Sequence, residues 1–271
     1  MLLIASCALP VEEAHADLMI NPTRIVFDKN RRAAQIDMIN DGAASATYRL
    51  VLVNRRMTEL GAFESIDSAG LDDLFANAML VYSPRQITLL PGAQQLVRVA
   101  LRKPEDLLPG EYRSHLLFEK VAEATGADNI ENLGRTPAGE VGVSLTALIG
   151  VSIPIIVRHG DTKADVVIDQ LALKKSVSGH APMLMLRLNR TGNRSVYGDL
   201  IVSFKRNGAP SEIVGRAAGV AVYTPNMVRR ANLDLQVPTA VTLEHGALAV
   251  SYIEQAEDGG KVMAQAAIEL P

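Results

Sequence analysis

The sequence predicts an all-β protein built from two β-sandwich domains. Most segments alternate apolar and polar residues with a period of two, and Gly, Pro, Asn and Asp turns separate them. A second series of such segments follows the turn-rich stretch Arg158–Asp161, which has the character of a hinge. At 48% hydrophobic and 21% charged residues, the chain has enough apolar material for packed cores.

The first predicted domain covers residues 17–158. In Gly110–Lys120, alternation places Tyr112 and Leu116 inside and leaves Arg113 and His115 on the opposite face. The apolar spacing in Leu71–Ala78 predicts one or two helical turns. The other predicted strands are Thr23–Phe27, Ala34–Asn40, Thr47–Val53, Ala78–Ser83, Gln86–Leu90 and Gln94–Lys103.

The segment Val141–Val157 predicts an unusually long amphipathic strand. Every odd position in it is apolar, whereas the even positions are mostly small or polar, with Leu148 and Ile156 as exceptions. Fully extended, it would reach about 55 Å at roughly 3.3 Å per residue. One small sandwich cannot cover so long an apolar stripe, so part of it must face something else. The polar stretch Val121–Glu140 before it is interpreted as a long loop.

The second predicted domain covers residues 159–271. Turn signals such as Asn207-Gly208 and His245-Gly246 separate its strands. The predicted strands are Asp165–Leu173, Met183–Asn189, Gly198–Lys205, Gly219–Tyr223, Ala231–Val237, Ala247–Ile253 and Met263–Glu269.

The N-terminus predicts export to the periplasm. Met1–Pro10 is apolar, and His15 lies between two alanines in the pattern of a signal-peptidase site, so residues 1–16 are expected to be removed after Ala16. The run is too short for a membrane span, and it lacks the usual basic residues, so the true start could lie upstream of Met1. Cys7 leaves a lipoprotein signal as the alternative. It is the only cysteine, so the mature chain would hold no disulfide, zinc finger or cysteine nucleophile.

Composition and motifs argue against several function classes. The formal net charge is −3 and no long basic run appears, which does not favour nucleic acid. Trp is absent and aromatic residues make up 4%, few for a sugar-binding surface. We find no phosphate-binding glycine loop and no nucleophile elbow. His115 has no second ligand at metal-binding spacing. We therefore predict no catalytic residue, no cofactor, no metal and no small-molecule substrate.

Several motifs resemble one known family. They are Asn21–Asp28 (NPTRIVFD), Arg31–Asn40, Tyr82–Arg85 (YSPR), Leu90–Arg98 (LPGAQQLVR), Gly110–Phe118 (GEYRSHLLF) and, more weakly, Val220–Pro225 and Gly246–Tyr252. In these the chain is similar to the two-domain periplasmic chaperones of chaperone–usher pilus assembly, and most to their archaic-type branch. The resemblance implies two immunoglobulin-like sandwiches in an L-shaped arrangement. It departs from the better-known branch because Ser152–Val157 lacks an anchoring lysine.

The resemblance implies that the protein lends a strand to pilus subunits. A pilin is a sandwich that lacks its last strand, and the chaperone fills the gap by β-augmentation until an outer-membrane usher receives the complex. The expected donor residues are Val143, Leu145, Ala147, Ile149 and Val151, with Ile153 and Ile155 in the chaperone's own core. The alternative is a long core strand that has no partner.

The resemblance also implies basic residues that hold the carboxylate at the C-terminus of the subunit. We expect Arg85 and Arg98 to do so, followed by Arg24 and Arg113, because a guanidinium can donate two parallel hydrogen bonds to a carboxylate. The alternative for each is a solvated surface arginine.

Two further functions stay open at this point. A structural or adhesive exported protein would self-associate and need no carboxylate pocket, and an exported hydrolase would need an acid or base with a perturbed pKa. Self-association of the free chaperone also stays open, because a long exposed apolar strand favours it.

Overall fold

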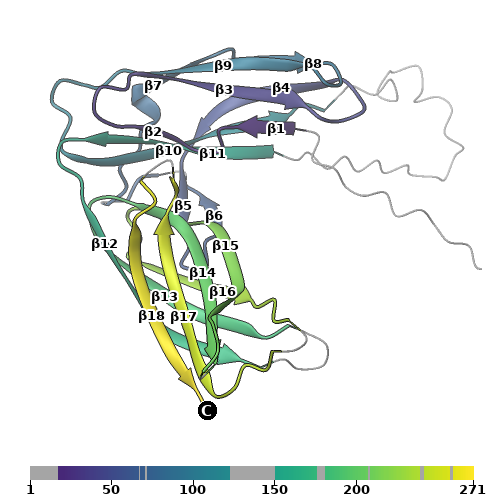
Figure 1. Cartoon of the computed structure of the whole chain (residues 1–271). Coiled ribbons are helices and arrows are strands. Elements are labelled where there is room, and N and C mark those ends of the chain that lie inside the picture. The colour runs from purple at the N-terminus through teal and green to yellow at the C-terminus, as the bar shows by residue number, and fades with distance from the viewer. Residues whose placement is uncertain are drawn as a thin grey trace, which may run out of the picture.

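The computed structural model describes residues 18–66, 68–70, 72–122, 150–175, 181–206, 208–238, 241–256 and 259–271. Within them the chain forms strands and one short 3₁₀ helix, arranged as two sandwiches. Figure 1 shows the sandwiches meeting at an angle as an L, with β12 (Ala164–Lys174) leading from one to the other. The predicted fold class is therefore confirmed.

The first sandwich consists of two main sheets and a hairpin. One sheet has the order β1-β3-β9-β7 and the other has the order β2-β11-β10-β4-β8, while β5 and β6 pair with each other. The strands of the first sheet are β1 (Leu18–Asn21), β3 (Ala33–Asn40), β9 (Gln94–Leu101) and β7 (Leu80–Ser83). Those of the second are β2 (Ile25–Phe27), β11 (Gly150–His159), β10 (Gly110–Lys120), β4 (Ala46–Val53) and β8 (Gln86–Leu89). The hairpin is β5 (Arg55–Met57) and β6 (Phe63–Ser65).

The second sandwich pairs a three-stranded with a four-stranded sheet. Their orders are β12-β13-β16 and β15-β14-β17-β18. The strands that follow β12 are β13 (Met183–Gly192), β14 (Val196–Arg206), β15 (Glu212–Val222), β16 (Val228–Asp234), β17 (Gly246–Glu254) and β18 (Val262–Leu270). All seven strands predicted for residues 159–271 are present.

The strand order of the first sandwich is that of an immunoglobulin domain. Its seven main strands in sequence are β1, β3, β4, β7, β9, β10 and β11, so the two sheets read A-B-E-D and G-F-C. The edge segment divides between the sheets: β1 pairs with β3, and β2 pairs with β11 after the turn at Pro22 and Thr23. This division places the beginning of β2 beside β11.

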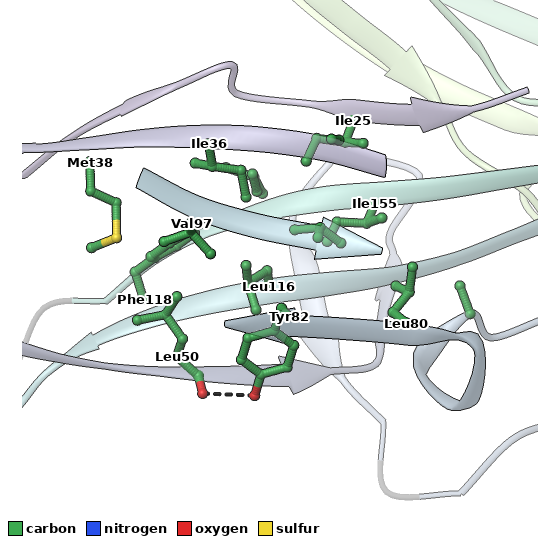
Figure 2. Close-up of a cluster of buried hydrophobic side chains, with 14 of the residues drawn as sticks. Ile25, Ile36, Met38, Leu50, Leu80, Tyr82, Val97, Leu116, Phe118 and Ile155 are labelled. Carbon is green, nitrogen blue, oxygen red and sulfur yellow. Dashed lines mark hydrogen bonds between the residues drawn. The ribbon is translucent and has the colours of Figure 1, made fainter. Parts of the chain in front are cut away.

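Alternation along the strands builds a separate core in each sandwich. In the first, side chains such as Ile36, Val97, Leu116 and Phe118 are fully buried between the sheets (Figure 2). The buried Tyr82 hydroxyl donates a 2.9 Å hydrogen bond to the Leu50 carbonyl, which joins the two sheets. In the second sandwich the core is lined by Leu184, Leu188, Leu200, Val202, Phe204, Leu248, Val250 and Tyr252, among others.

Strand β11 is the described part of the predicted long strand. Ile153 and Ile155 lie in the first core, as expected, whereas Val151 is exposed. The predicted donor residues Val143, Leu145, Ala147 and Ile149 lie outside the described residues. The strand ends at His159, next to the predicted boundary between residues 158 and 159.

The helical turns predicted for Leu71–Ala78 are largely wrong. The only helix in the described part of this segment is a 3₁₀ turn at Asn77–Met79. The chain before it lies along β10, where the Leu74 carbonyl accepts a 2.8 Å hydrogen bond from the Arg113 amide. Tertiary hydrogen bonding therefore replaces the bonds that a helix would have formed.

A matched pair of leucine substitutions tests the first core. Leu116 is 0% exposed and Leu90 is 66% exposed. We expect Leu116→Ala to lower the free energy of unfolding by about 2–5 kcal/mol, through lost burial and a residual cavity. Leu90→Ala should change it by less than about 0.5 kcal/mol. Urea unfolding measured by circular dichroism checks both, and equal losses would contradict the core assignment.

Candidate functional site

The edge of β11 is open over its first half. Gly150–Pro154 pair with β10 on one side. On the other side, β2 pairs with Ile155–Val157 only, and no described strand pairs with the residues before them. Pro154 suits such a position because proline cannot donate a ladder hydrogen bond and is confined to edges in sheets. The open edge leaves backbone groups available for a further strand.

The second half of β11 is buried on both faces. Ile155 and Val157 lie in the first core, whereas Ile156 points to the opposite face and is also fully buried. Ile156 packs with Met57 of the hairpin and with Ala221 and Tyr223 of the second sandwich. This contact between the sandwiches explains why Ile156 breaks the alternation of the sequence.

Arg24 lies at the place where the open edge ends. Ile25 of β2 is level with Ile155, so Arg24 is level with Pro154 and, because Ile25 is in the core, on the opposite face. It is half-buried in a pocket of about 310 Å³ between the sandwiches, which Arg31, Tyr197 and other residues line. Its guanidinium carbon is 4.5 Å from the centre of the Tyr197 ring, a cation–π contact with the second sandwich.

Arg113 lies on the same face of the sheet as Arg24 but is buried. Its Nη2 donates a 3.3 Å hydrogen bond to the Thr224 carbonyl of the second sandwich, and its guanidinium stacks 4.7 Å from the Tyr223 ring. Burial lowers the pKa of Arg113. Arg113 therefore contacts the second sandwich directly instead of lining the pocket around Arg24.

Beside Arg113, His115 is held neutral. Its ring packs edge-on against Phe63 with 4.8 Å between centroids, and its Nε2 is 3.5 Å from Arg113 Nη1. Its Nδ1 is buried and has no hydrogen-bond partner among the described residues. Burial, then the charges of Arg113 and Arg55, lower the pKa of His115 from 6.5 to about 3.

A buried carboxylate joins the two sandwiches. Glu111 is 1% exposed, and its Oε1 accepts hydrogen bonds from the amide of Ser195, at 3.1 Å, and from its hydroxyl. Its Oε2 accepts a 3.1 Å hydrogen bond from Arg158 Nε at the end of β11. A buried carboxylate with these partners is stable because each oxygen is bonded, and it fixes the second sandwich against β10 and β11.

The β5–β6 hairpin forms a second connection. The Arg230 amide donates a 2.7 Å hydrogen bond to the Glu59 carbonyl, and the side chains of these two residues also pair at 3.0 Å. Gly61 has a positive φ of 85°, and a Cβ there would lie 2.0 Å from the Arg229 guanidinium carbon. Another residue at this turn would be strained by the left-handed φ and would push the Arg229 side chain aside, so glycine suits the position.

The four arginines predicted as a carboxylate anchor fall into two groups. Arg24 and Arg113 lie where the sandwiches meet. Arg85 is exposed after β7, where its Nη1 donates a 3.0 Å hydrogen bond to the Tyr82 hydroxyl. Arg98 is exposed on β9, opposite Gln35 and Ser83. The structure thus does not bring Arg85 and Arg98 together with Arg24.

Sequence reasoning missed several residues of this region. Arg31 and Gln255 line the pocket with Arg24, and Glu111 is a buried connection between the sandwiches. Alternation assigns a residue to a face of its sheet but carries no signal for what covers that face, so only the pairing of the two sandwiches reveals these roles.

The described residues contain no group of three His, Cys, Asp or Glu side chains arranged to hold a metal. Within the same residues, no helix combines the length and the apolar character that crossing a bilayer would take.

The buried histidine predicts a specific acid sensitivity. The unfolded chain takes up a proton on His115 near its ordinary pKa of 6.5, whereas the folded protein does so only near 3. Folding stability from this group is thus complete above pH 6.5 and falls as the pH drops towards 3, by at most about 1.4 kcal/mol per pH unit. We expect His115→Gln to flatten this dependence, as measured by urea unfolding at pH 7, 6, 5 and 4.

The exposed His245 provides the control for this experiment. Because His245 has a left-handed φ of 52°, asparagine is the suitable replacement. His245→Asn should retain the wild-type pH dependence. Parallel curves for wild type and His115→Gln would contradict the assignment of the acid sensitivity to His115.

Comparison with known proteins gives structural likenesses only. No family model matches the sequence, and no curated protein matches it. The CsuC–CsuE chaperone–tip adhesion subunit complex of Acinetobacter baumannii superposes with a TM-score of 0.44 at 14% identity, over 94% of this chain and 98% of that chain. The Escherichia coli chaperone DraB gives 0.45 at 14% identity, over 94% and 96%. The Pseudomonas aeruginosa CupB2 chaperone gives 0.45 at 10% identity, over 93% and 100%. At such identities and scores, the function of this chain has to be argued from its own residues.

Proposed function

We propose that this protein is a periplasmic chaperone that binds pilus subunits by lending them the edge of β11 and then delivers them to an outer-membrane usher. The observation that carries the proposal is the open edge at Gly150–Pro154, which ends beside the pocket of Arg24. Main-chain hydrogen bonds along such an edge bind an extended partner strand.

The register determines where the C-terminus of an added parallel strand would lie. β11 runs from Gly150 towards Arg24, and β2 occupies the edge from Ile155 onwards. A partner strand parallel to β11 would therefore end with its C-terminus at the level of Pro154 and Arg24. A chain that ends there presents a carboxylate to a guanidinium, and such a pair is strong because both partners are charged.

Side chains of the donor strand would fill the groove of the subunit. Val151 is the exposed donor within the described residues, and Val143, Leu145, Ala147 and Ile149 continue its alternation in the sequence. Each large apolar side chain newly buried contributes about 1.5–3 kcal/mol. Several such positions hold a subunit firmly, yet a strand that fits better can replace them.

Among the four arginines, we assign the direct carboxylate contact to Arg24, with Arg31 as its neighbour in the pocket. Arg113 adds positive charge on the same face of the sheet, and its hydrogen bond to the Thr224 carbonyl keeps the second sandwich in place. A contact by Arg85 or Arg98 stays a prediction, and the experiment below tests it separately.

A second candidate is a structural protein that uses the same edge to pair with its own copies. The open edge and the exposed Val151 fit a second copy of the chain as well as a subunit. The two functions differ in the carboxylate pocket, because two β11 edges can pair without a free C-terminus.

Co-expression with pilus subunits from the same source tests the proposal. We expect a soluble one-to-one complex on a tagged chaperone, lost with Val151→Asp, which would bury an unpaired charge. Arg24→Ala should reduce the yield at least about ten-fold, since a charge-assisted hydrogen bond contributes about 1.5–3 kcal/mol and 1.4 kcal/mol is ten-fold. Arg85→Ala and Arg98→Ala test the two other predicted anchors and should leave the yield unchanged if Arg24 makes the contact.

The outcomes separate the alternatives. Loss with Arg85→Ala or Arg98→Ala, but not with Arg24→Ala, would keep the donor edge and assign the anchor to Arg85 or Arg98 in place of Arg24. Self-association without retention of any subunit would reject the chaperone function in favour of the structural one.

A further inference from the structure

A second pocket lies at the outer side of the elbow, where the chain passes from β11 to β12. It has a volume of about 390 Å³, and residues from both sandwiches line it. Lys29 comes from the turn after β2, Lys103 follows β9, Arg158 is next to the last residue of β11, and Arg194 lies between β13 and β14. This pocket and that of Arg24 have no lining residue in common, so the two are separate sites.

The lining of this elbow pocket is predominantly cationic. Lys29, Lys103, Arg158 and Arg194 line it together with only two carboxylates, those of Asp28 and Asp161. Arg158 and Arg194 also pair with Glu111 and Glu254, which are not among the lining residues. Several positive side chains from separate elements thus converge on one cavity.

One of these cations lacks full compensation. The Lys103 ammonium donates a 2.7 Å hydrogen bond to the Arg158 carbonyl. Burial and the charge of Arg32 lower the pKa of Lys103, and the opposing effect of Asp28 is smaller. An acceptor with negative charge in the pocket would compensate the Lys103 ammonium.

We propose that the elbow pocket binds a small oxyanion of the phosphate or sulfate type. Such an anion offers several acceptor oxygens to donors that approach from different directions, which is what ammonium and guanidinium groups on four chain segments provide. The volume greatly exceeds the roughly 30 Å³ of one water, so the pocket has room for an oxyanion with part of its hydration.

The bound anion would connect the two sandwiches. Lys29, Lys103 and Arg158 belong to the first, and Arg194 belongs to the second. The anion would therefore add a further contact between the sandwiches and would stiffen the elbow. This inference does not rest on the proposed function, because the open edge of β11 takes no part in it.

Titration of the full chain with inorganic phosphate tests the site. We would measure amide shifts by NMR and the dissociation constant by calorimetry, at an ionic strength held constant with sodium chloride. Melting temperatures are less suitable, because phosphate stabilises folded proteins in general. Saturable shifts at Gly160 and Thr162 are expected, and a parallel titration with glycerol 3-phosphate distinguishes the free oxyanion from a phosphate monoester.

Three substitutions on exposed side chains decide the outcome. Lys29→Gln should raise the dissociation constant at least five-fold, and Asp161→Asn should lower it about three-fold because it removes a repelling carboxylate. Lys205→Gln, a charge change on the distant strand β14, should leave it unchanged. Arg194→Gln should abolish binding, and the two exposed pocket variants keep the test valid if that protein does not fold.

Absence of saturable shifts at the elbow would overturn the proposal. So would equal dissociation constants for wild type, Lys29→Gln and Asp161→Asn. If Lys205→Gln raised the dissociation constant as much as Lys29→Gln does, the effect would come from the net charge of the protein and not from the pocket. This result would also overturn the proposal.

Discussion

The structure depends on strand β11, whose second half is covered by neighbours and whose first half has an open edge. From Ile155 to Val157 the strand has neighbours on both edges, β10 and β2, and packed side chains on both faces. From Gly150 to Pro154 it has one described neighbour only. The first part fixes the strand rigidly, so the open part is held in a defined position instead of collapsing onto the sandwich. A binding edge needs both properties, because ordering a mobile strand on binding would cost conformational entropy.

The face of the sheet that meets the second sandwich carries several basic side chains. Cross-strand neighbours share a face, so Val26, Ile156 and Arg113 form one row, and the row before it runs through Pro154 and His115. Covering that face with the second sandwich buries charge, which is costly unless each charge finds partners. The Thr224 carbonyl and the Tyr223 ring contact Arg113 and compensate its charge. His115 avoids the cost because its lowered pKa keeps the ring neutral.

Alternation in the sequence was sufficient to predict strands and faces. It assigned Ile153 and Ile155 to the core and Arg113 and His115 to the opposite face, and the structure confirms these assignments. It did not predict the β5–β6 hairpin, whose strands have three residues each and are too short for a periodic signal. It also could not separate Arg24 from Arg98, because both are polar positions of predicted strands and only the docking of the second sandwich makes them different.

Pro154 lies where the open edge of β11 ends, on a strand that carries no lysine. The resemblance to pilus chaperones leads one to expect a lysine on the long strand, whereas β11 carries proline at the level where its edge becomes covered. A proline there ends the ladder and leaves no backbone N–H unpaired, because it has none. The neighbouring segment places Arg24 at the same level, on the face towards the second sandwich. Arg24, directly before β2, puts a positive charge at the end of the open edge, where the last residue of an added strand would lie under the proposed function. The lack of a lysine in β11 is therefore compatible with the proposed carboxylate anchor, provided that Arg24 supplies the charge.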